Sequence, residues 1–584
     1  MNPMRNGLLV ILLWAAPLLS TPAHASQSLL DRQALKEAQT HLGARAAGTG
    51  GVAPLPLAQA GPQPVTAASN SALSRIARTS GPRRVLVGVR AHSQLVGLAR
   101  VLRRLGAAPE AFEEIGVLAA TVPSGPALAR ALDGDRRVAY VERDTQLRIA
   151  ADPFDVPDPE HDGLKYTWFF DEVRAADALA AAGGGSRRTV AVLDTGLDRS
   201  HPEFAGQVAR VYDTHVGGKD VTDVVGHGTF VTGLIAAVDG NGIGGKGVAG
   251  NTKVLAIRAS RDGGFTERDL LRGIAFAVGR GADVLNLSLA GDGIDRSVVR
   301  ALEAAFYNDV LPVAASGNLG DRRNGVGVLN PVQFPAAVLG GRHGAPGIGL
   351  SVAATRPNGA PAEFSTHNRR VSLSAPGAST GDCRFGVLST LPASANTEWD
   401  HPNSCNRIYG QGGPRFAYGE GTSFAAPIVS GIASLVWDVE PRLASEQVAE
   451  VLTRSSRQTR GTGWNEFTGS GIVDGKAATD LARVYDVTAP RARAQARRHG
   501  NSVSVRMAPT EDRTEPGREL ASGVTYGVLV SRNGGRSFNI VASGRTRPIR
   551  RSVRLRGRSV NVVAVTACDR NGNCAVRRLG RFRP

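Results

Sequence analysis

The sequence has no long apolar run after its N-terminus, only four cysteines, and no lysine and few aromatic residues in its last part. After the first 25 residues, no stretch is long and apolar enough to cross a bilayer, so we expect no membrane span. The four cysteines do not have the spacing of a zinc site with histidines nearby. From Arg491 to the end there is no lysine, few aromatic residues and no nucleic-acid-binding motif. These absences argue against a membrane-embedded, a zinc-binding or a nucleic-acid-binding protein.

The N-terminus has the three parts of a secretory signal peptide. Arg5 is the positive charge, residues 8–19 are an apolar core, and Ala23-His24-Ala25 is a small-x-small cleavage site. The alternative is a membrane anchor, but the core is short for a span of about 20 residues. We therefore expect residues 1–25 to be a signal peptide and the protein to be secreted, as an extracellular, periplasmic or cell-surface protein.

An exported chain with an even number of cysteines favours disulfides. Four cysteines allow three pairings. We expect Cys383–Cys405 and Cys568–Cys574, because each pair lies within one proposed domain.

Positive charge is concentrated at the C-terminal end. The net charge is +18, and the residues from Arg491 onward hold 21 arginines against five acidic residues. Such a region can attract nucleic acid, anionic lipid or acidic polymers. The interpretation we favour here is the solvated surface of a protein from an arginine-rich proteome, with no nucleic-acid partner.

At 584 residues the chain is too long for one ordinary domain. Residues 26–82 are rich in Ala, Gly and Pro and are typical of a flexible leader. Residues 83–150 suggest a small α+β unit with two helices and three strands, the third over 136–150. Residues 151–486 alternate apolar strands with helices. Residues 487–584 alternate apolar and polar residues between turns, which predicts a β-sandwich of fibronectin-III or immunoglobulin type.

The alternating region predicts an α/β fold. Near-continuous apolar strands that alternate with helices indicate a parallel sheet covered by helices on both faces. In such sheets the chemistry gathers at the carboxyl ends of the strands. Asp194 ends the first of these strands, in VAVLDTGLD, and His227 begins a helix, in GHGTFVTG.

A hydroxyl group stands at the start of another apolar helix. Ser423 lies in GTSFAAPIVSG, where it is either a helix N-cap or a nucleophile. A serine needs a base and an orienting acid beside it to be a nucleophile. Asp194, His227 and Ser423 follow one another in the chain order Asp, His, Ser that is found in subtilisin.

DTGLDRSHPEF, GHGTFVTGLIAA and GTSFAAPIVSG each resemble one of the three catalytic motifs of the subtilisin family. The resemblance runs from about residue 155 to about 480. It implies a subtilisin-like fold and a serine endopeptidase with protein or peptide substrates. Its catalytic residues are Asp194, His227 and Ser423, with Asn318, in PVAASGN, as the oxyanion-hole residue. The segments that line the substrate are then Ser288, Leu289, Ala290 and Gly291, and Ala315, Ser316 and Gly317.

Residues 138–150 are similar to the end of the family's inhibitory propeptide. The resemblance implies that residues 83–150 assist folding, inhibit the enzyme from within the chain and are removed by self-cleavage near Ala150–Ala151. A stable accessory domain is the alternative. If residues 83–150 are a propeptide, its C-terminal end LRIA indicates that the enzyme accepts a small apolar residue before the scissile bond.

Some positions depart from the family pattern. Phe230 replaces a frequent histidine, and Ala290 replaces a frequent glycine in the cleft. Asp292 and Asp295 leave open a preference for basic side chains. DGNGIGGKG resembles a calcium-binding loop in which Asn241 is a ligand, but the family's acidic ligand falls at Glu203, one methylene longer than Asp. A structural calcium ion and a plain Gly-rich turn both remain open, and catalysis needs no cofactor.

These features predict a secreted, self-processing serine endopeptidase of broad specificity, which we expect to be a monomer. One alternative is a binding protein whose peptidase domain is an inactive scaffold and whose basic sandwich is the working part. Another is a peptidase restricted to a single maturation target.

Overall fold

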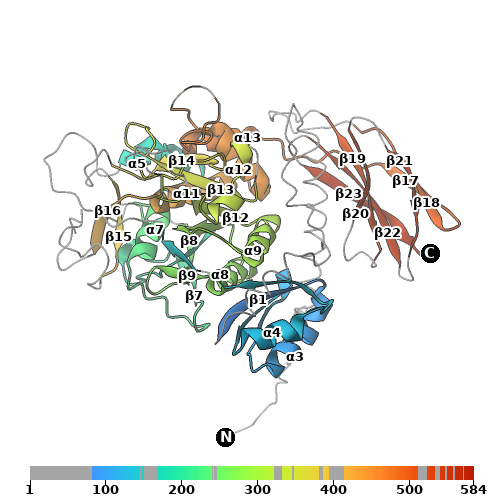
Figure 1. The fold of residues 1–584 in the computed structure, drawn as a ribbon. Coiled ribbons are helices and arrows are strands. Elements are labelled where there is room, and N and C mark those ends of the chain that lie inside the picture. Colours follow the sequence, from blue (N-terminus) through green and yellow to red (C-terminus); the bar gives the residue numbers. More distant parts are fainter. Residues whose placement is uncertain are drawn as a thin grey trace, which may run out of the picture.

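The computed structural model describes three folded parts of the chain (Figure 1). The signal peptide and almost all of the leader lie outside the described residues, as do Ala150, Ala151, Cys383 and Cys405. The described residues are 82–144, 146–149, 168–239, 241, 246–250, 252–320, 332–344, 347–379, 386–393, 414–459, 461, 463–510, 518, 523–532, 539–545, 549–556, 560–569, 571 and 573–583.

The first part is a small α+β domain. Its antiparallel sheet has the order β2-β3-β1-β4, and α3 and α4 pack on it through Leu98, Leu102 and Leu128. A short strand, β2, was not predicted. The elements are β1 (Arg83–Val89), α3 (Leu95–Arg104), β2 (Glu110–Phe112), β3 (Val117–Val122), α4 (Gly125–Leu132) and β4 (Val138–Arg143).

The strand expected over residues 136–150 is divided in two. β4 stays in the small domain, whereas β5 (Gln146–Ile149) joins β11 and β9 of the next domain. The break falls next to Asp144, whose carboxylate accepts a hydrogen bond from the backbone N–H of Arg268 (3.0 Å). Because this contact draws the chain toward the second domain, the prediction of one continuous strand was wrong.

The second part contains a seven-stranded sheet in which every pair of neighbouring strands is parallel, as predicted. Apart from the edge strand β7, its strands are almost entirely buried, which explains their continuous apolar runs. In sheet order they are β14 (Leu373–Pro376), β13 (Leu350–Thr355), β12 (Leu311–Ala315), β10 (Val284–Leu287), β6 (Thr189–Asp194), β8 (Lys253–Arg258) and β7 (Val208–Asp213).

Alternate side chains of β6 enter two separate apolar cores, one on each face of the sheet. Val190 and Val192 belong to the core with α7 and α11, whereas Ala191 and Leu193 belong to the core with α8 and α9. The first face carries α5 (Trp168–Glu172), α6 (Ala175–Ala181), α7 (His227–Ala236), α11 (Thr422–Val439), α12 (Ser445–Ser455) and α13 (Gly475–Val484), and the second carries α8 (Glu267–Gly279), α9 (Arg296–Tyr307) and α10 (Ala336–Leu339).

Four short strands complete this domain. β15 (Val387–Leu391) and β16 (Arg415–Gly419) form a hairpin, and β9 (Gly264–Thr266) and β11 (Leu289–Ala290) flank β5. Contrary to the expectation from the sequence, one stretch is long and apolar enough to cross a membrane, and among the described residues it is α11 alone. It is 94% buried, as expected for the core helix of a folded domain.

The third part is the predicted β-sandwich, and it packs its two sheets around Val503, Val505, Val528 and Val563. One sheet contains β17 (Ala494–His499), β18 (Ser502–Met507) and β21 (Arg550–Arg554). The other contains β20 (Asn539–Arg545), β19 (Thr525–Ser531), β22 (Asn561–Cys568) and β23 (Cys574–Phe582).

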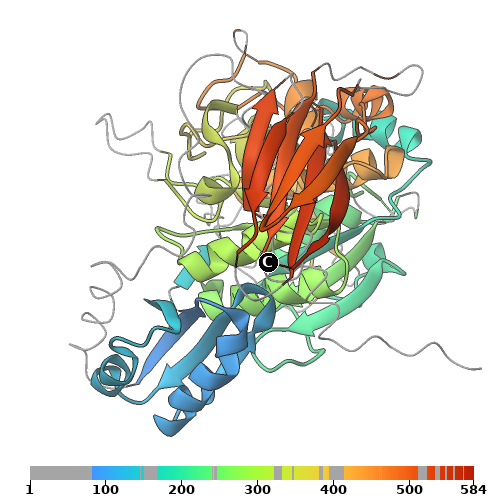
Figure 2. The ribbon, with the colours of Figure 1, turned by 90° about the vertical axis from the view of Figure 1, so that its right-hand side faces the viewer.

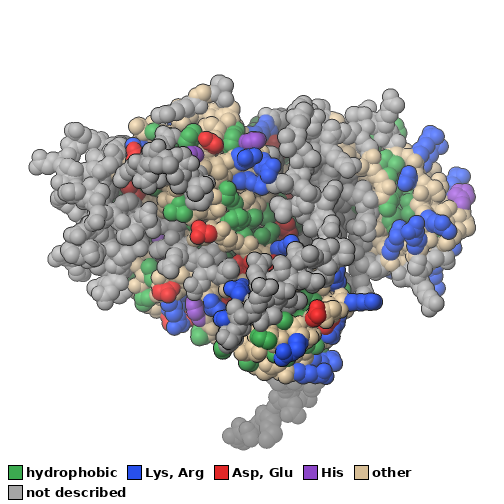
Figure 3. All heavy atoms as spheres, viewed as in Figure 1, with side chains coloured by type: hydrophobic (Ala, Val, Ile, Leu, Met, Phe, Trp, Pro, Cys, Tyr) green, Lys and Arg blue, Asp and Glu red, His purple; other side chains and the backbone are tan. Residues whose placement is uncertain are grey.

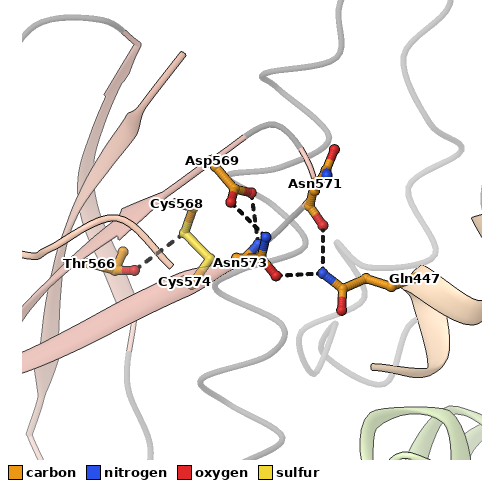
Figure 4. Close-up of a disulfide and its surroundings, with 7 residues drawn as sticks. All are labelled: Gln447, Thr566, Cys568, Asp569, Asn571, Asn573 and Cys574. Carbon is orange, nitrogen blue, oxygen red and sulfur yellow. Dashed lines mark hydrogen bonds between the residues drawn. A yellow bond between two sulfur atoms is a disulfide. The ribbon is translucent and has the colours of Figure 1, made fainter. Parts of the chain in front are cut away.

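A disulfide-closed turn attaches the sandwich to the peptidase-like domain (Figure 4). The predicted bond between Cys568 and Cys574 joins β22 to β23. Gln447 of α12 donates from Nε2 to Asn573 Oδ1 (2.6 Å) and to the carbonyl of Asn571 (3.1 Å). Asn573 also donates to the carbonyl of Asp486 (2.7 Å). The turn is therefore tied both to a helix and to the segment that links the domains.

Candidate active site

The carboxyl end of β6 and the start of α7 bring Asp194 and His227 into contact. The imidazole Nδ1 lies 2.7 Å from Asp194 Oδ1, and both side chains are completely buried. The backbone N–H of Thr195 donates to the same carboxylate oxygen (2.8 Å). A carboxylate accepting at Nδ1 places the proton on that nitrogen and leaves Nε2 as the basic atom of the neutral ring.

Ser423 lies in the first turn of α11, on the same side of the sheet as His227. Its hydroxyl donates to the carbonyl of Ser288 (3.2 Å), and the Ser288 hydroxyl donates back to the carbonyl of Ser423 (2.7 Å). The next residue, Phe424, has its ring centre 5.6 Å from that of His227. The Ser288 bonds thus fasten the start of α11 to the residue that follows β10, and the Phe424 contact places that helix start beside the imidazole.

Asn318 follows β12 and contacts the residue before Ser423. Its Oδ1 accepts from the backbone N–H (3.0 Å) and the hydroxyl (2.8 Å) of Thr422. These two bonds identify the acceptor end of the amide, so Nδ2 is the end that can donate to a further group. Asp194, His227, Ser423 and Asn318 therefore come from four elements to one region of the domain.

The predicted substrate strand pairs with the tail of the small domain. Leu289 and Ala290 of β11 form antiparallel pairs with Ile149 and Arg148 of β5. On its other edge, β5 pairs with β9. A backbone segment that enters here is hydrogen-bonded on both edges, which is how extended peptides are held by β-addition.

The predicted lining segments continue on both sides of this strand. Gly291 exchanges two backbone hydrogen bonds with Phe334 (3.0 and 2.9 Å). Ala315 ends β12, the Ser316 hydroxyl donates to the carbonyl of Thr366, and the Gly317 N–H donates to the hydroxyl of Thr422 (3.1 Å).

Gln333 lies against Gly317 and was missed from the sequence. A Cβ at Gly317, where φ is 106°, would lie 1.8 Å from Gln333 Oε1. The Thr366 hydroxyl donates to this Oε1 (2.9 Å), which holds the buried amide in place. Residue 317 must therefore lack a side chain.

Asp223 was also missed, although it joins the two elements that carry Asp194 and His227. Its Oδ1 accepts from the Thr195 hydroxyl (2.9 Å) and the Gly226 N–H (2.8 Å). Its Oδ2 accepts from the N–H (2.8 Å) and hydroxyl (2.7 Å) of Thr229, in the first turn of α7. The signal that could have identified it is an acidic residue just before a helix that begins Gly-His-Gly-Thr, because helix N-termini favour carboxylates.

The predicted calcium residues lie together. Asn241 donates from Nδ2 to Glu203 Oε2 (3.0 Å). Glu203 is fully buried, and burial raises its pKa to about 7. Its Oε1 has no hydrogen-bond partner among the residues that the structure describes. Such an oxygen fits a cation ligand, although the same residues contain no group of three or more His, Cys, Asp or Glu side chains able to hold a metal.

Carboxylates of the small domain meet helix starts of the larger one. Glu142 accepts from the backbone N–H groups of Arg296 (3.2 Å) and Ser297 (3.3 Å) at the start of α9. Burial and the nearby Asp295 carboxylate raise the pKa of Glu142 to about 7. Asp295, considered from the sequence as a contact for basic substrates, thus lies at this domain interface.

The comparisons agree with this geometry. The family model described as "Subtilase family" matches residues 185–471. A thermophilic serine proteinase from Bacillus sp. (strain AK1) is 29% identical over 56% of this chain and 71% of its own. The M-protease of Shouchella clausii (strain KSM-K16) is 30% identical over 63% of this chain and 80% of its own.

Among solved structures, one described as proteases from Pseudoalteromonas arctica PAMC 21717 is 27% identical. The match covers 54% of this chain and 97% of that chain, with a TM-score of 0.46.

We predict that Asp223→Ala lowers the free energy of unfolding by about 3 kcal/mol, because several buried donors lose their acceptor at once. Urea unfolding in a Ser423→Ala background measures this without self-digestion. Asp220→Ala is the matched control, because that carboxylate is 67% exposed and its ion pair with Arg258 should contribute about 1 kcal/mol or less. Equal losses in the two variants would contradict the role of Asp223.

We also predict that Glu142 makes the uncleaved chain less stable as pH rises. Its pKa is raised in the folded chain, so its contribution is complete below its unfolded pKa and is lost as pH approaches about 7. The urea unfolding of Ser423→Ala is compared with that of Ser423→Ala/Glu142→Gln across this pH range. The difference between the two chains gives the contribution of Glu142 protonation to the free energy of unfolding, which should be on the order of 2–3 kcal/mol. Parallel pH curves for the two chains would show that Glu142 does not titrate in this range.

Proposed function

Since this chain belongs to the subtilase family and is a serine-type endopeptidase, we propose that it is an exported enzyme that removes its own propeptide and then cleaves proteins with broad specificity. The observation that carries this proposal is the convergence of the buried Asp194–His227 pair on the helix start that bears Ser423. Export rests on the sequence of residues 1–25.

We assign the acyl-transfer roles as follows. Ser423 Oγ attacks the scissile carbonyl while His227 Nε2 takes its proton, and the imidazolium then gives that proton to the leaving amine. Asp194 keeps the proton on Nδ1 and stabilises the imidazolium. Water repeats the attack on the acyl-enzyme with His227 as the base. The Asp194–His227 contact of 2.7 Å supports this assignment.

Asn318 is assigned to the oxyanion hole. The bonds from Thr422 hold its Oδ1, so that Nδ2 and the backbone N–H of Ser423 are the two donors to the tetrahedral oxygen. Fixed donors stabilise the developing charge without reorganising during the reaction, which is the source of most of their effect.

The position of β5 supports self-processing. Ile149 pairs with Leu289, the residue that follows Ser288, and the Ser288 carbonyl accepts from the Ser423 hydroxyl, so the described end of β5 lies near Ser423. We therefore assign the scissile bond to Ala150–Ala151, as the family resemblance implies, with residues 83–150 acting as an intramolecular inhibitor after cleavage. This placement also favours a small apolar residue before the scissile bond in other substrates.

We infer that Glu203 and Asn241 help to hold a structural calcium ion. The unpaired, buried Glu203 Oε1 supports this, and the Asn241 amide would turn to present Oδ1. Calcium takes 6–8 oxygen ligands, so further oxygen atoms would have to complete the set. The ion would stabilise this loop and take no part in hydrolysis.

Self-cleavage predicts different N-termini for two purified proteins. The wild type should begin near residue 151, and Ser423→Ala should retain residues 83–150, as measured by intact mass and N-terminal sequencing. Ser200→Ala, which changes an exposed serine, should process like the wild type. If Ser423→Ala also loses the segment, another protease performs the maturation. If the wild type keeps it, the proposal fails.

Asn318→Ala should lower kcat by about 10²–10³ and change KM little, because the lost donor acts mainly in the transition state. Asn318→Asp is the matched variant. It keeps an acceptor for Thr422 but has no amide donor, so it should retain thermal stability and lose activity. A raised KM with unchanged kcat would assign Asn318 to ground-state binding instead.

A further inference from the structure

One sheet of the C-terminal sandwich presents a face on which arginines are gathered. Strand pairing forms three rows across it: His499–Ser502–Arg554, Arg497–Ser504–Ser552 and Gln495–Arg506–Arg550. The alternate residues of β18, Val503 and Val505, are buried in the sandwich core, so these rows lie on the solvent side. We call them the outer face.

The outer face has no neutralising partner among the described residues. Its four arginines are exposed, and no ion pair of theirs is found. Asp569 is the one acidic residue described after Arg491, and it is fully buried near the disulfide turn. In Figure 3 the described part of the sandwich shows basic side chains, which are all arginines because this region has no lysine, and no acidic ones.

The outer face points away from the rest of the molecule. β17, β18 and β21 lie on the far side of the sandwich from the peptidase domain in Figure 1, and they face the viewer in Figure 2. The opposite sheet carries the turn that docks on Gln447. A partner on the outer face would therefore leave the active site accessible.

We propose that the outer face binds the surface of an anionic lipid bilayer. Arginine binds phosphate oxygens in a bidentate manner, and the hydroxyls of Ser504 and Ser552 in the middle row are further donors, whereas the Ser502 hydroxyl already donates to the His499 carbonyl (3.0 Å). Positions on a sheet are separated by about 4.8 Å across strands and about 6.8 Å between alternate residues, so the charges form a two-dimensional array. Such an array complements a plane of lipid phosphates.

The composition of the face distinguishes this partner from nucleic acid. Single strands are held by aromatic side chains on which bases stack, and duplexes by an element that enters a groove. Among its nine residues the outer face contains no Phe, Tyr or Trp, a single imidazole ring (His499), and no protruding helix or loop. It also has no apolar side chain to insert between lipids, so binding should be electrostatic and reversible by salt.

The test is flotation of the full Ser423→Ala chain with vesicles of phosphatidylcholine and phosphatidylglycerol in equal parts. We expect binding at low ionic strength, release at about 1 M salt, and none to pure phosphatidylcholine. Replacing Arg497, Arg506, Arg550 and Arg554 together by Gln should weaken the partition by about tenfold or more.

The matched control removes the same charge elsewhere. Arg577, Arg578, Arg581 and Arg583, on and just after β23, are also exposed, and their fourfold Gln variant should bind within about threefold of the parent. Equal weakening by both variants would overturn the proposal in favour of net charge alone. Binding to duplex or single-stranded DNA but not to the vesicles would assign the face to nucleic acid, and binding to neither would overturn it. Circular dichroism verifies folding of the variants.

Discussion

The whole arrangement depends on the buried contact between Asp194, at the end of β6, and His227, at the start of α7. Asp194 and His227 have no access to solvent, so their 2.7 Å contact must replace the hydration that both groups lose. This contact requires the end of β6 and the start of α7 to lie side by side. The five hydrogen bonds of Asp223 to Thr195, Val225, Gly226 and Thr229 enforce this, because they fasten the strand end to the first helical turn.

Hydrogen bonds also join the helix that carries Ser423 to the strands at the cleft. Ser288 and Ser423 exchange hydrogen bonds, so the residue that leads into β11 is attached to the helix that carries the hydroxyl. β5 occupies the free edges of β11 and β9, as a substrate backbone would. If residues 83–150 are the propeptide that we propose, the edge that holds extended peptides is also the edge that the propeptide closes, and inhibition and recognition use one set of backbone groups.

Much of this was predictable because the chemistry lies in short motifs at strand and helix ends. Asp194, His227 and Ser423 each stand beside glycines or small residues at such an end, and the sheet could be predicted from continuous apolar runs. Asp223 was missed although four of its five hydrogen bonds are to Val225, Gly226 and Thr229, which are close to it in the chain. The role of Glu142 was not predictable, because its partners are distant in sequence. The division of residues 136–150 into two strands has the same origin: contacts with another domain override the local β-pattern.

In the C-terminal domain, too, the sequence alone was insufficient. It shows an excess of arginine, but an excess of arginine is also found on surfaces that contact only solvent. Strand register adds the decisive information, because it places Arg497, Arg506, Arg550 and Arg554 on one plane and Asp569 far from it, inside the disulfide turn. The turn docks on Gln447 and thereby directs that plane outward. If the outer face binds a bilayer as we propose, this fixed orientation holds the cleft in a defined position relative to the lipid surface, which a loosely attached basic domain could not do.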